Sequence, residues 1–200
     1  AEVAPDRGEV EELKPYFREP APPEPSPPRP FAPSRPIDAL PPACGLLDED
    51  GGSSFLRGRL IHRLLELLPE LHPEARADSA ERFLARPAHG LEPEAQAEIA
   101  AEVLAVFNDP RAEALFGPDS RAEVPLAAVL GKHVISGQVD RLVVEEGRVL
   151  VVDYKSGRAA PQDESAIEKA YVAQMATYRA VLRVIFAGRE IRCALLFTDG

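Results

Sequence analysis

Hydrophobic residues between positions 53 and 116 recur at the spacing of α-helices. The apolar stripe of the first predicted helix consists of Phe55, Leu56, Leu60, Ile61, Leu64, Leu65 and Leu68. It begins directly after Ser53 and Ser54, whose hydroxyls can cap a helix. The same spacing predicts further helices at about 74–86 and 93–108 and a short one at 110–116.

The pattern then changes to alternation of apolar and polar residues, which is typical of strands. Strands are predicted at about 121–129, 133–145 and 148–155, with turns at Gly131-Lys132 and Glu146-Gly147. Turns this short join neighbouring antiparallel strands. The three segments are therefore predicted to form a meander.

A second helical pattern and a last alternating segment follow the meander. The helix is predicted at about 163–187, ending at Gly188, and the strand at 190–198. The order of helices, meander, helix and strand predicts an α/β or α+β core. In this core, helices flank a mixed sheet whose centre is the antiparallel meander.

Proline dominates the beginning of the chain. Residues 1–42 hold 13 of the 21 prolines, in runs that favour extended polyproline II conformation. We therefore predict a tether or linker over residues 1–52 and a single domain over residues 53–200. The alternative is a strap lying across a partner or across this domain. Because the sequence lacks an initiator Met and a signal peptide, we expect a piece of a longer chain that continues beyond Gly200.

The composition excludes several classes of protein. The apolar runs are too short for a membrane span, and Cys44 and Cys193 are too few for a disulfide framework, a four-cysteine zinc site or an iron-sulfur cluster. A reducing cytoplasm therefore fits the chain best. The sequence also lacks a P-loop, so ATP hydrolysis is not expected from these residues.

The formal charge of −10 is unusual for a protein that binds nucleic acid, because phosphate binding depends on Lys and Arg. The acidity is unevenly placed, since residues 1–52 carry a net charge of −6 and residues 121–160 a net charge of +1. A weakly charged face predicts poor binding of DNA by this chain alone. Other domains or subunits are then expected to deliver the strand.

The residues with the clearest chemistry lie in the predicted meander. Side chains in a strand alternate between faces, so Asp153 and Lys155 share one face and Tyr154 points to the other. If Glu146-Gly147 is a two-residue turn, the register places Asp140 directly opposite Asp153. Two carboxylates about 5 Å apart repel each other unless a cation lies between them.

A bound Mg²⁺ or Mn²⁺ is the simplest cation for such an oxygen-rich pair. The metal would polarise a phosphoryl oxygen and activate water, and Lys155 would position that water or stabilise developing charge. The alternative is a surface hairpin in which Asp140 pairs with Arg141 or Arg158. The apolar run from Val149 to Val152 argues against it, because this run marks a buried central strand.

Three further side chains are candidates for the same site. His62 follows Gly58 by one helical turn, where the missing Cβ permits close approach, and its imidazole can bind a metal. A packed or solvated histidine is the alternative. Gln174 and Tyr178 lie one turn apart, and they could support Lys155 or contact a DNA strand. The alternative is a core position for Tyr178 and a surface position for Gln174.

Taken together, these motifs resemble the ordered motif set of PD-(D/E)xK nucleases of the RecB type. The set comprises Gly58-x-x-x-His62, Glu123, Gly137-x-x-Asp140, Asp153-Tyr154-Lys155 and Gln174-x-x-x-Tyr178. The resemblance covers about residues 53–200 and implies a restriction-endonuclease-like core. The segments Leu115-Phe116-Gly117-Pro118 and Asp153 to Arg158 are similar to nuclease domains of the bacterial AddAB type of helicase-nuclease.

The resemblance implies a Mg²⁺-dependent deoxyribonuclease. His62, Asp140, Asp153 and the Tyr154 carbonyl would be metal ligands, Lys155 the catalytic lysine, and Gln174 and Tyr178 the family's QxxxY motif.

It also implies a helicase domain before Ala1, an AddB-like subunit, and a single DNA strand as substrate during double-strand-break repair. ATP would enter only through those helicase domains, and no iron-sulfur cluster is expected. An alternative is a catalytically inactive nuclease fold that holds DNA or a partner subunit. A glycosidase is less compatible with a lysine beside adjacent carboxylates.

Overall fold

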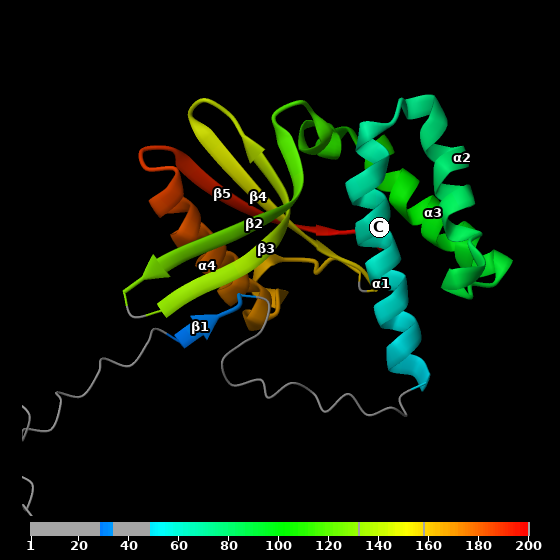
Figure 1. Ribbon diagram of the computed structural model, residues 1–200, viewed down its shortest axis with the longest axis horizontal. Coiled ribbons are helices and arrows are strands. Elements are labelled where there is room, and N and C mark those ends of the chain that lie inside the picture. Colours follow the sequence, from blue (N-terminus) through cyan, green and yellow to red (C-terminus); the bar gives the residue numbers. More distant parts are fainter. Residues whose placement is uncertain (1–28, 34–48, 132, 158, 200) are drawn as a thin grey trace, which may run out of the picture.

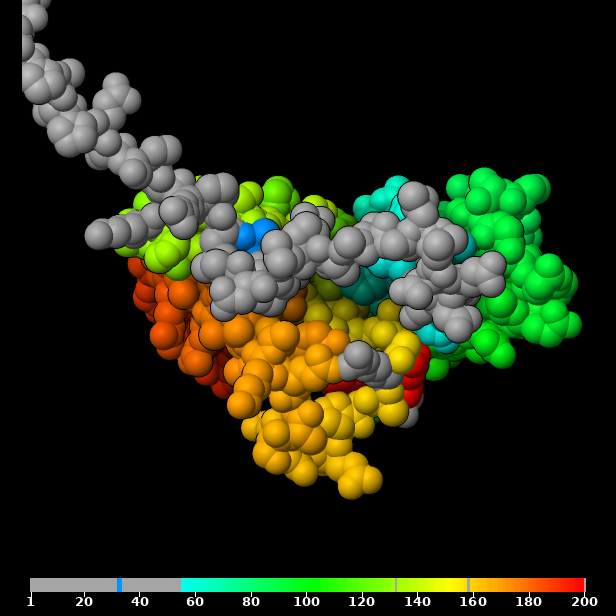
Figure 2. Space-filling view, turned by 90° about the horizontal axis from the view of Figure 1, so that it is seen from below, coloured from blue at the N-terminus to red at the C-terminus, as the bar shows by residue number. Residues whose placement is uncertain are grey.

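The computed structural model describes residues 29–33, 49–131, 133–157 and 159–199. In this part of the chain, helices cover both faces of a five-stranded mixed sheet (Figure 1). The predicted α/β class, with a mixed sheet flanked by helices, is confirmed. Figure 2 shows the green helices and the orange-red helix on opposite sides of the molecule.

Three helices cover one face of the sheet. They are α1 (Glu49–Leu67), α2 (Pro73–Leu84) and α3 (Pro93–Asn108), followed by the 3₁₀ segment η4 (Pro110–Phe116). Helix α1 begins four residues before Ser53, so Ser53 and Ser54 lie inside the helix and the predicted cap is wrong. None of the helices in the described ranges combines the length and apolar character needed to cross a membrane.

The predicted meander is confirmed. Strands β2 (Ser120–Leu130), β3 (His133–Val144) and β4 (Arg148–Lys155) pair antiparallel in sequence order. Strand β5 (Glu190–Phe197) lies parallel to β4, as expected for strands joined by a helical crossover. The sheet is therefore mixed.

Helix α4 covers the other face of the sheet, but it begins later than predicted. It spans Lys169–Ile185. The Asp163 side chain accepts a hydrogen bond from the Ser165 amide and caps the 3₁₀ turn η5 (Glu164–Ala166). The chain then runs extended through Ile167, with a ψ of 133°. A local cap thus replaces the first turns of the predicted helix.

The two faces of the sheet bury separate hydrophobic clusters. On one face, α1, α2 and α3 pack against side chains such as Val143, Val152 and Tyr154. On the other face, α4 packs against residues such as Val149 and Val151. Burial on both faces explains why β4 is almost continuously apolar, as strands covered by two layers are.

Strands β2 and β3 reverse their faces in the middle of the hairpin. Val139 belongs to the cluster under α4, whereas Arg141, two residues later, donates a hydrogen bond to the Leu65 carbonyl of α1. Strict alternation would keep these two side chains on one face. The reversal occurs at Asp140 and at Glu123 opposite it, whose φ of +50° lies in the left-handed region that non-glycine residues rarely adopt.

A short strand also pairs with the sheet from within the proline-rich segment. Strand β1 (Arg29–Phe31) lies parallel to the beginning of β3, and buried Pro33 follows it. An ideal Cβ on Gly137 would lie 3.0 Å from the Pro33 ring. Residues 29–33 thus fit the strap alternative. The rest of residues 1–42 lies outside the described ranges, and the division of the chain between residues 52 and 53 stays a prediction.

Candidate metal centre and active site

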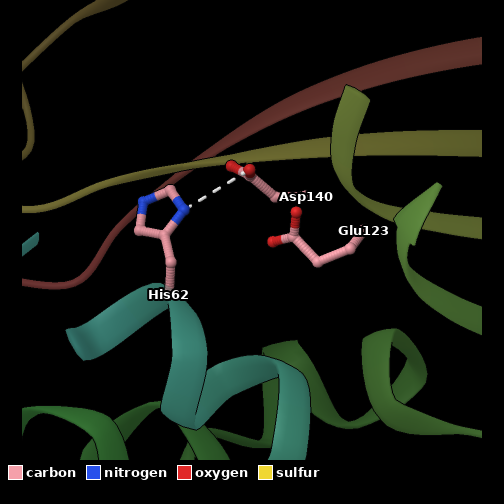
Figure 3. A group of neighbouring side chains, drawn as sticks. All are labelled: His62, Glu123 and Asp140. Atoms are coloured by element: carbon pink, nitrogen blue, oxygen red, sulfur yellow. Dashed lines mark ion pairs between the residues drawn. The ribbon is translucent and has the colours of Figure 1, made fainter. Parts of the chain in front are cut away.

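Three side chains that can bind a metal converge where α1 meets the meander. His62 comes from α1, Glu123 from β2 and Asp140 from β3, and Figure 3 shows them pointing toward one another. One ligand atom of each lies within 4.8 Å of the others. The Nδ1 atom of His62 is 3.4 Å from Oδ1 of Asp140. One imidazole and two carboxylates suit a divalent cation.

Gly58 lets α1 approach the end of β4, as expected from its sequence position. A Cβ at this residue would lie 2.9 Å from the Ser156 Oγ atom. A side chain at this position would therefore require the Ser156 hydroxyl to move. His62 lies one turn further along the same helix, on the same face as Gly58.

Glu123 belongs to this cluster although sequence reasoning gave it no ligand role. Its carboxylate accepts a hydrogen bond from the Gln138 amide, with 2.6 Å between Nε2 and Oε2. The register of β2 and β3 places Glu123 opposite Asp140. The sequence could have predicted this pairing. A two-residue turn at Gly131-Lys132 pairs Leu130 with His133, and the same register pairs Glu123 with Asp140.

Asp140 and Asp153 follow the last pair of the β3–β4 hairpin, and their side chains contact different helices, His62 of α1 and Gln174 of α4. The last paired residues of β3 and β4 are Arg141 and Val152, so the two aspartates follow in the same register. Oδ2 of Asp140 accepts a hydrogen bond from the Tyr154 amide at 2.6 Å. Asp140 thus replaces a backbone acceptor, and its Oδ1 remains directed at His62.

Asp153 makes its contacts on the α4 side of the sheet. Its Oδ2 lies 2.6 Å from the Nζ atom of Lys155, and its Oδ1 accepts a hydrogen bond from Gln174 at 2.8 Å. Asp153 is therefore next to the cluster of His62, Glu123 and Asp140 but outside it. The shared face of Asp153 and Lys155 follows from strand alternation and agrees with the prediction.

The carboxylates carry more negative charge than their surroundings neutralise. Burial and the Asp140 carboxylate raise the pKa of Asp153, although Lys155 opposes this shift. Burial and Asp140 likewise raise the pKa of Glu123. Burial lowers the pKa of His62, but its hydrogen bond with Asp140 and the other carboxylates outweigh burial and raise it overall. Such a site favours a cation.

Of the predicted pair on α4, Gln174 contacts Lys155 directly and Tyr178 contacts Gln174. The Nζ atom of Lys155 donates to the Gln174 side-chain oxygen at 3.2 Å and lies 4.0 Å from the centre of the Tyr171 ring. Gln174 is 8% exposed and Tyr178 is 1% exposed, so neither is a surface residue. The Tyr178 hydroxyl donates to the Gln138 carbonyl at 2.8 Å, and Gln138 in turn holds Glu123. Tyr171 had no sequence signal.

The end of β4 is held from the opposite side by the helices. The backbone amide of Thr198 donates to the Lys155 carbonyl at 3.0 Å. The Thr198 hydroxyl donates to Glu102 of α3, which also pairs with Arg57 of α1. The position of the Lys155 backbone is thus coupled to the packing of both helices.

Arg141 does not neutralise Asp140. Its buried guanidinium donates to the Tyr154 hydroxyl at 2.8 Å, the Ser120 hydroxyl at 3.2 Å and the Leu65 carbonyl at 2.7 Å. The predicted alternative of an Asp140–Arg141 pair is therefore wrong, because the face reversal turns Arg141 toward α1. Arg158, the other proposed partner, lies outside the described residues.

A cleft of about 880 Å³ gives access to the cluster. His62, Glu123 and Asp140 line it together with Ser156, and α1 forms a wall that includes Phe55 and Arg59. The cluster is therefore accessible to a substrate of appreciable size.

Comparison with known proteins points to one family. The sequence profile described as "PD-(D/E)XK nuclease superfamily" matches residues 35–199. Among solved structures, the chain resembles the crystal structure of SSO0001, with 16% identity, coverage of 75% of this chain and 74% of that chain, and a TM-score of 0.33. It also resembles protein VC1899 from Vibrio cholerae, with 13% identity, coverage of 76% and 47%, and a TM-score of 0.28. A search of curated protein sequences found no match.

Proposed function

Because the chain belongs to the PD-(D/E)XK nuclease superfamily, we propose that it hydrolyses phosphodiester bonds of DNA with a divalent metal ion. The observation that carries this proposal is the convergence of His62, Glu123 and Asp140 beside the Asp153–Lys155 pair. Mg²⁺ is the proposed ion, and Mn²⁺ is the expected substitute.

The donor set fits such an ion. His62 Nδ1 and Oδ1 of Asp140 are directed at the same space, and Glu123 adds a second carboxylate. Asp153 and the Tyr154 carbonyl are proposed as the remaining ligands, since Asp153 lies close enough to Asp140 for the two charges to interact, where the β3–β4 ladder ends. When bound, the ion supplies a Lewis acid that polarises the phosphoryl oxygen and lowers the pKa of a water molecule.

Lys155 is the proposed catalytic residue. Its ammonium group is held by Asp153, Gln174 and the ring of Tyr171, so it is positioned before a substrate arrives. A fixed cation stabilises the negative charge that develops on phosphate oxygens during hydrolysis, and it can orient the attacking water. Gln174 positions both Lys155 and Asp153 through its side-chain hydrogen bonds. Tyr178 holds the backbone carbonyl of Gln138, whose side chain bonds Glu123.

We further propose that the substrate is one strand delivered by an attached helicase during double-strand-break repair in the cytoplasm. The similarity of the motif wording to helicase-nucleases of the AddAB type supports this role, with an AddB-like subunit as partner. The net charge of −10 also supports delivery by other domains, because it disfavours independent capture of DNA. Both exonuclease and endonuclease modes are compatible with this proposal.

The test changes Lys155→Ala in the parent helicase-nuclease. Metal binding should persist, because an ammonium group is not a ligand. Strand cleavage should fall by at least about a hundredfold, as expected for loss of a group that acts on transition-state charge. Unwinding by the helicase domains should continue and yield longer uncut strands on a gel.

Lys169→Ala is the matched control, since Lys169 is an exposed lysine at the start of α4. This control should cleave like the unchanged protein. Near-normal cleavage by Lys155→Ala would exclude the catalytic role and favour the inactive, DNA-holding alternative. An equal loss of unwinding would assign Lys155 a structural role instead.

A further inference from the structure

One face of α1 carries an exposed aromatic ring, Phe55, beside the guanidinium group of Arg59. Phe55 is 69% exposed and is the only aromatic residue among the exposed large hydrophobic side chains of the described ranges. The Arg59 guanidinium carbon lies 5.8 Å from the centre of the Phe55 ring. Arg59 makes no ion pair with any residue that the structure describes, whereas Arg57 and Arg63 pair with glutamates.

This pair shares its helix face with the metal cluster. Phe55, Arg59 and His62 are spaced by four and three residues, so they lie along one face of α1. All three line the same cleft. With a helical rise of about 1.5 Å per residue, Phe55 lies about 10 Å from His62 along the axis. That distance corresponds to about three phosphates of a stacked strand.

The chemistry of the pair matches a strand with accessible bases. A phenylalanine ring offers a flat apolar face and no hydrogen-bonding group, so it stacks on any base without reading sequence. The adjacent guanidinium is suited to a phosphate. Bases inside a duplex are stacked on their neighbours, and their faces are not available to Phe55. A strand with free bases therefore suits the pair better than a duplex does.

We propose that Phe55 and Arg59 form a strand-holding platform that stacks a base of single-stranded DNA on Phe55 and neutralises a phosphate with Arg59. The platform holds the strand about three nucleotides from the phosphate that is cleaved. This inference rests on the proposed nuclease function, since it assigns the substrate path of that site. Charge complementarity at Arg59 and continuity with the metal cluster favour DNA as the occupant.

The test measures binding in the Lys155→Ala background, where hydrolysis does not interfere. Fluorescence anisotropy with a labelled single-stranded oligodeoxynucleotide and a matched hairpin duplex would compare Phe55→Leu with Phe55→Tyr. Leu keeps the apolar character but removes the aromatic face, and Tyr keeps the ring. Phe55→Leu should weaken single-strand binding about tenfold, because base-aromatic stacking contributes about 1–3 kcal/mol per base. Phe55→Tyr should retain binding, and duplex binding should not change.

Two controls separate this inference from the proposed function. Val184→Ala removes an exposed apolar side chain from α4, away from the cleft, and should bind like the parent. The stabilisation of the folded protein by Mn²⁺ should be the same for all Phe55 variants, because Phe55 is not a ligand. If Mn²⁺ stabilises none of these proteins, the proposed metal site is wrong. The anisotropy measurements still test whether Phe55 holds the strand.

Cleavage kinetics in the otherwise unchanged protein give a second readout. Phe55→Leu should raise KM for a single strand about tenfold and leave kcat nearly unchanged, since the platform holds substrate away from the reacting atoms. Equal weakening of single-strand and duplex binding would overturn the stacking role. Unchanged DNA binding with loss of a partner subunit would assign Phe55 to a protein interface and overturn the proposal.

Discussion

At the scale of single residues, the carboxylates of the site oppose the folded state when no metal is bound. Burial and the negative charge of Asp140 raise the pKa of both Asp153 and Glu123, so the charge of Asp140 is unfavourable to theirs. Asp140 nevertheless has a structural contact, because its Oδ2 accepts the Tyr154 amide hydrogen. An asparagine can keep that hydrogen bond through its side-chain oxygen and lose the charge.

We therefore expect Asp140→Asn to increase stability in the absence of metal and to abolish stabilisation by Mg²⁺. Removing the repulsion is worth about 1 kcal/mol at most, or about 2–4 °C in the melting temperature of a chain this long. Thermal melts at alkaline pH, where His62 is neutral, would measure both effects. Glu74→Gln is the control, since Glu74 is exposed outside the site. A full metal-induced shift in Asp140→Asn would exclude Asp140 as a ligand.

Residue-level prediction succeeded where strand alternation applies and failed where the backbone departs from it. The shared face of Asp153 and Lys155, and the β3–β4 register as far as Arg141 and Val152, followed from alternation and a short turn. The side-chain position of Arg141 did not, because the face reversal beside Glu123 depends on a left-handed residue that a sequence pattern does not reveal. The contact of Lys155 with Tyr171 requires the packing of α4.

At the scale of secondary-structure elements, the least expected feature is β1. Polyproline-like composition argues against a strand, but three residues pair parallel with β3 and Pro33 packs beside Gly137. Parallel pairing joins residues about a hundred positions apart, as Arg29 with His133, so local patterns carry no signal for it. By contrast, α2, α3 and the meander have strong local periodicity and were predicted correctly.

Removal of residues 1–33 should lower the melting temperature by a few degrees, because it removes the β1–β3 hydrogen bonds and uncovers Gly137. Gly137→Ala should also destabilise the full chain, since the added Cβ would lie 3.0 Å from the Pro33 ring. The informative measurement is the double variant. Gly137→Ala should cost much less in the shortened chain, where Pro33 is absent.

Gly147→Ala is the matched control for that comparison, because a Cβ there meets no atom within 4 Å. Its effect should be small and equal in both chain lengths. If removal of residues 1–33 leaves the melting temperature unchanged, β1 does not stabilise the domain, and residues 1–52 act as the tether that composition predicts. Additive effects of the truncation and Gly137→Ala would show that Pro33 and Gly137 are not in contact in solution.

At the scale of the whole molecule, the net negative charge of the chain opposes binding of DNA. The chain carries 33 acidic and 23 basic side chains, yet its proposed substrate is a polyanion. Several basic residues near the cleft are already paired, as Arg57 is with Glu102 and Arg63 with Glu66. Arg59 and Lys155 are the cations proposed to meet phosphate, and the bound metal would add positive charge.

A small number of phosphate contacts predicts a weak dependence of binding on salt. Each neutralised phosphate of a single strand contributes about −0.7 to the slope of log K against log salt. With two or three contacts, the slope should be about −2, and affinity should depend more on stacking at Phe55 than on charge. Anisotropy titrations of the Lys169→Ala and Arg59→Gln variants at several salt concentrations would measure this.

Arg59→Gln should make the slope shallower by about 0.7, the contribution of one phosphate, and Lys169→Ala should leave it unchanged. A slope of about −5 or steeper in the unmodified chain would require a broad basic surface that neither Arg59 nor Lys155 provides. The strand would then be held mainly by residues outside this cleft. A shallow slope with weak affinity would instead favour a nuclease domain that depends on its attached motor to keep the strand at the site.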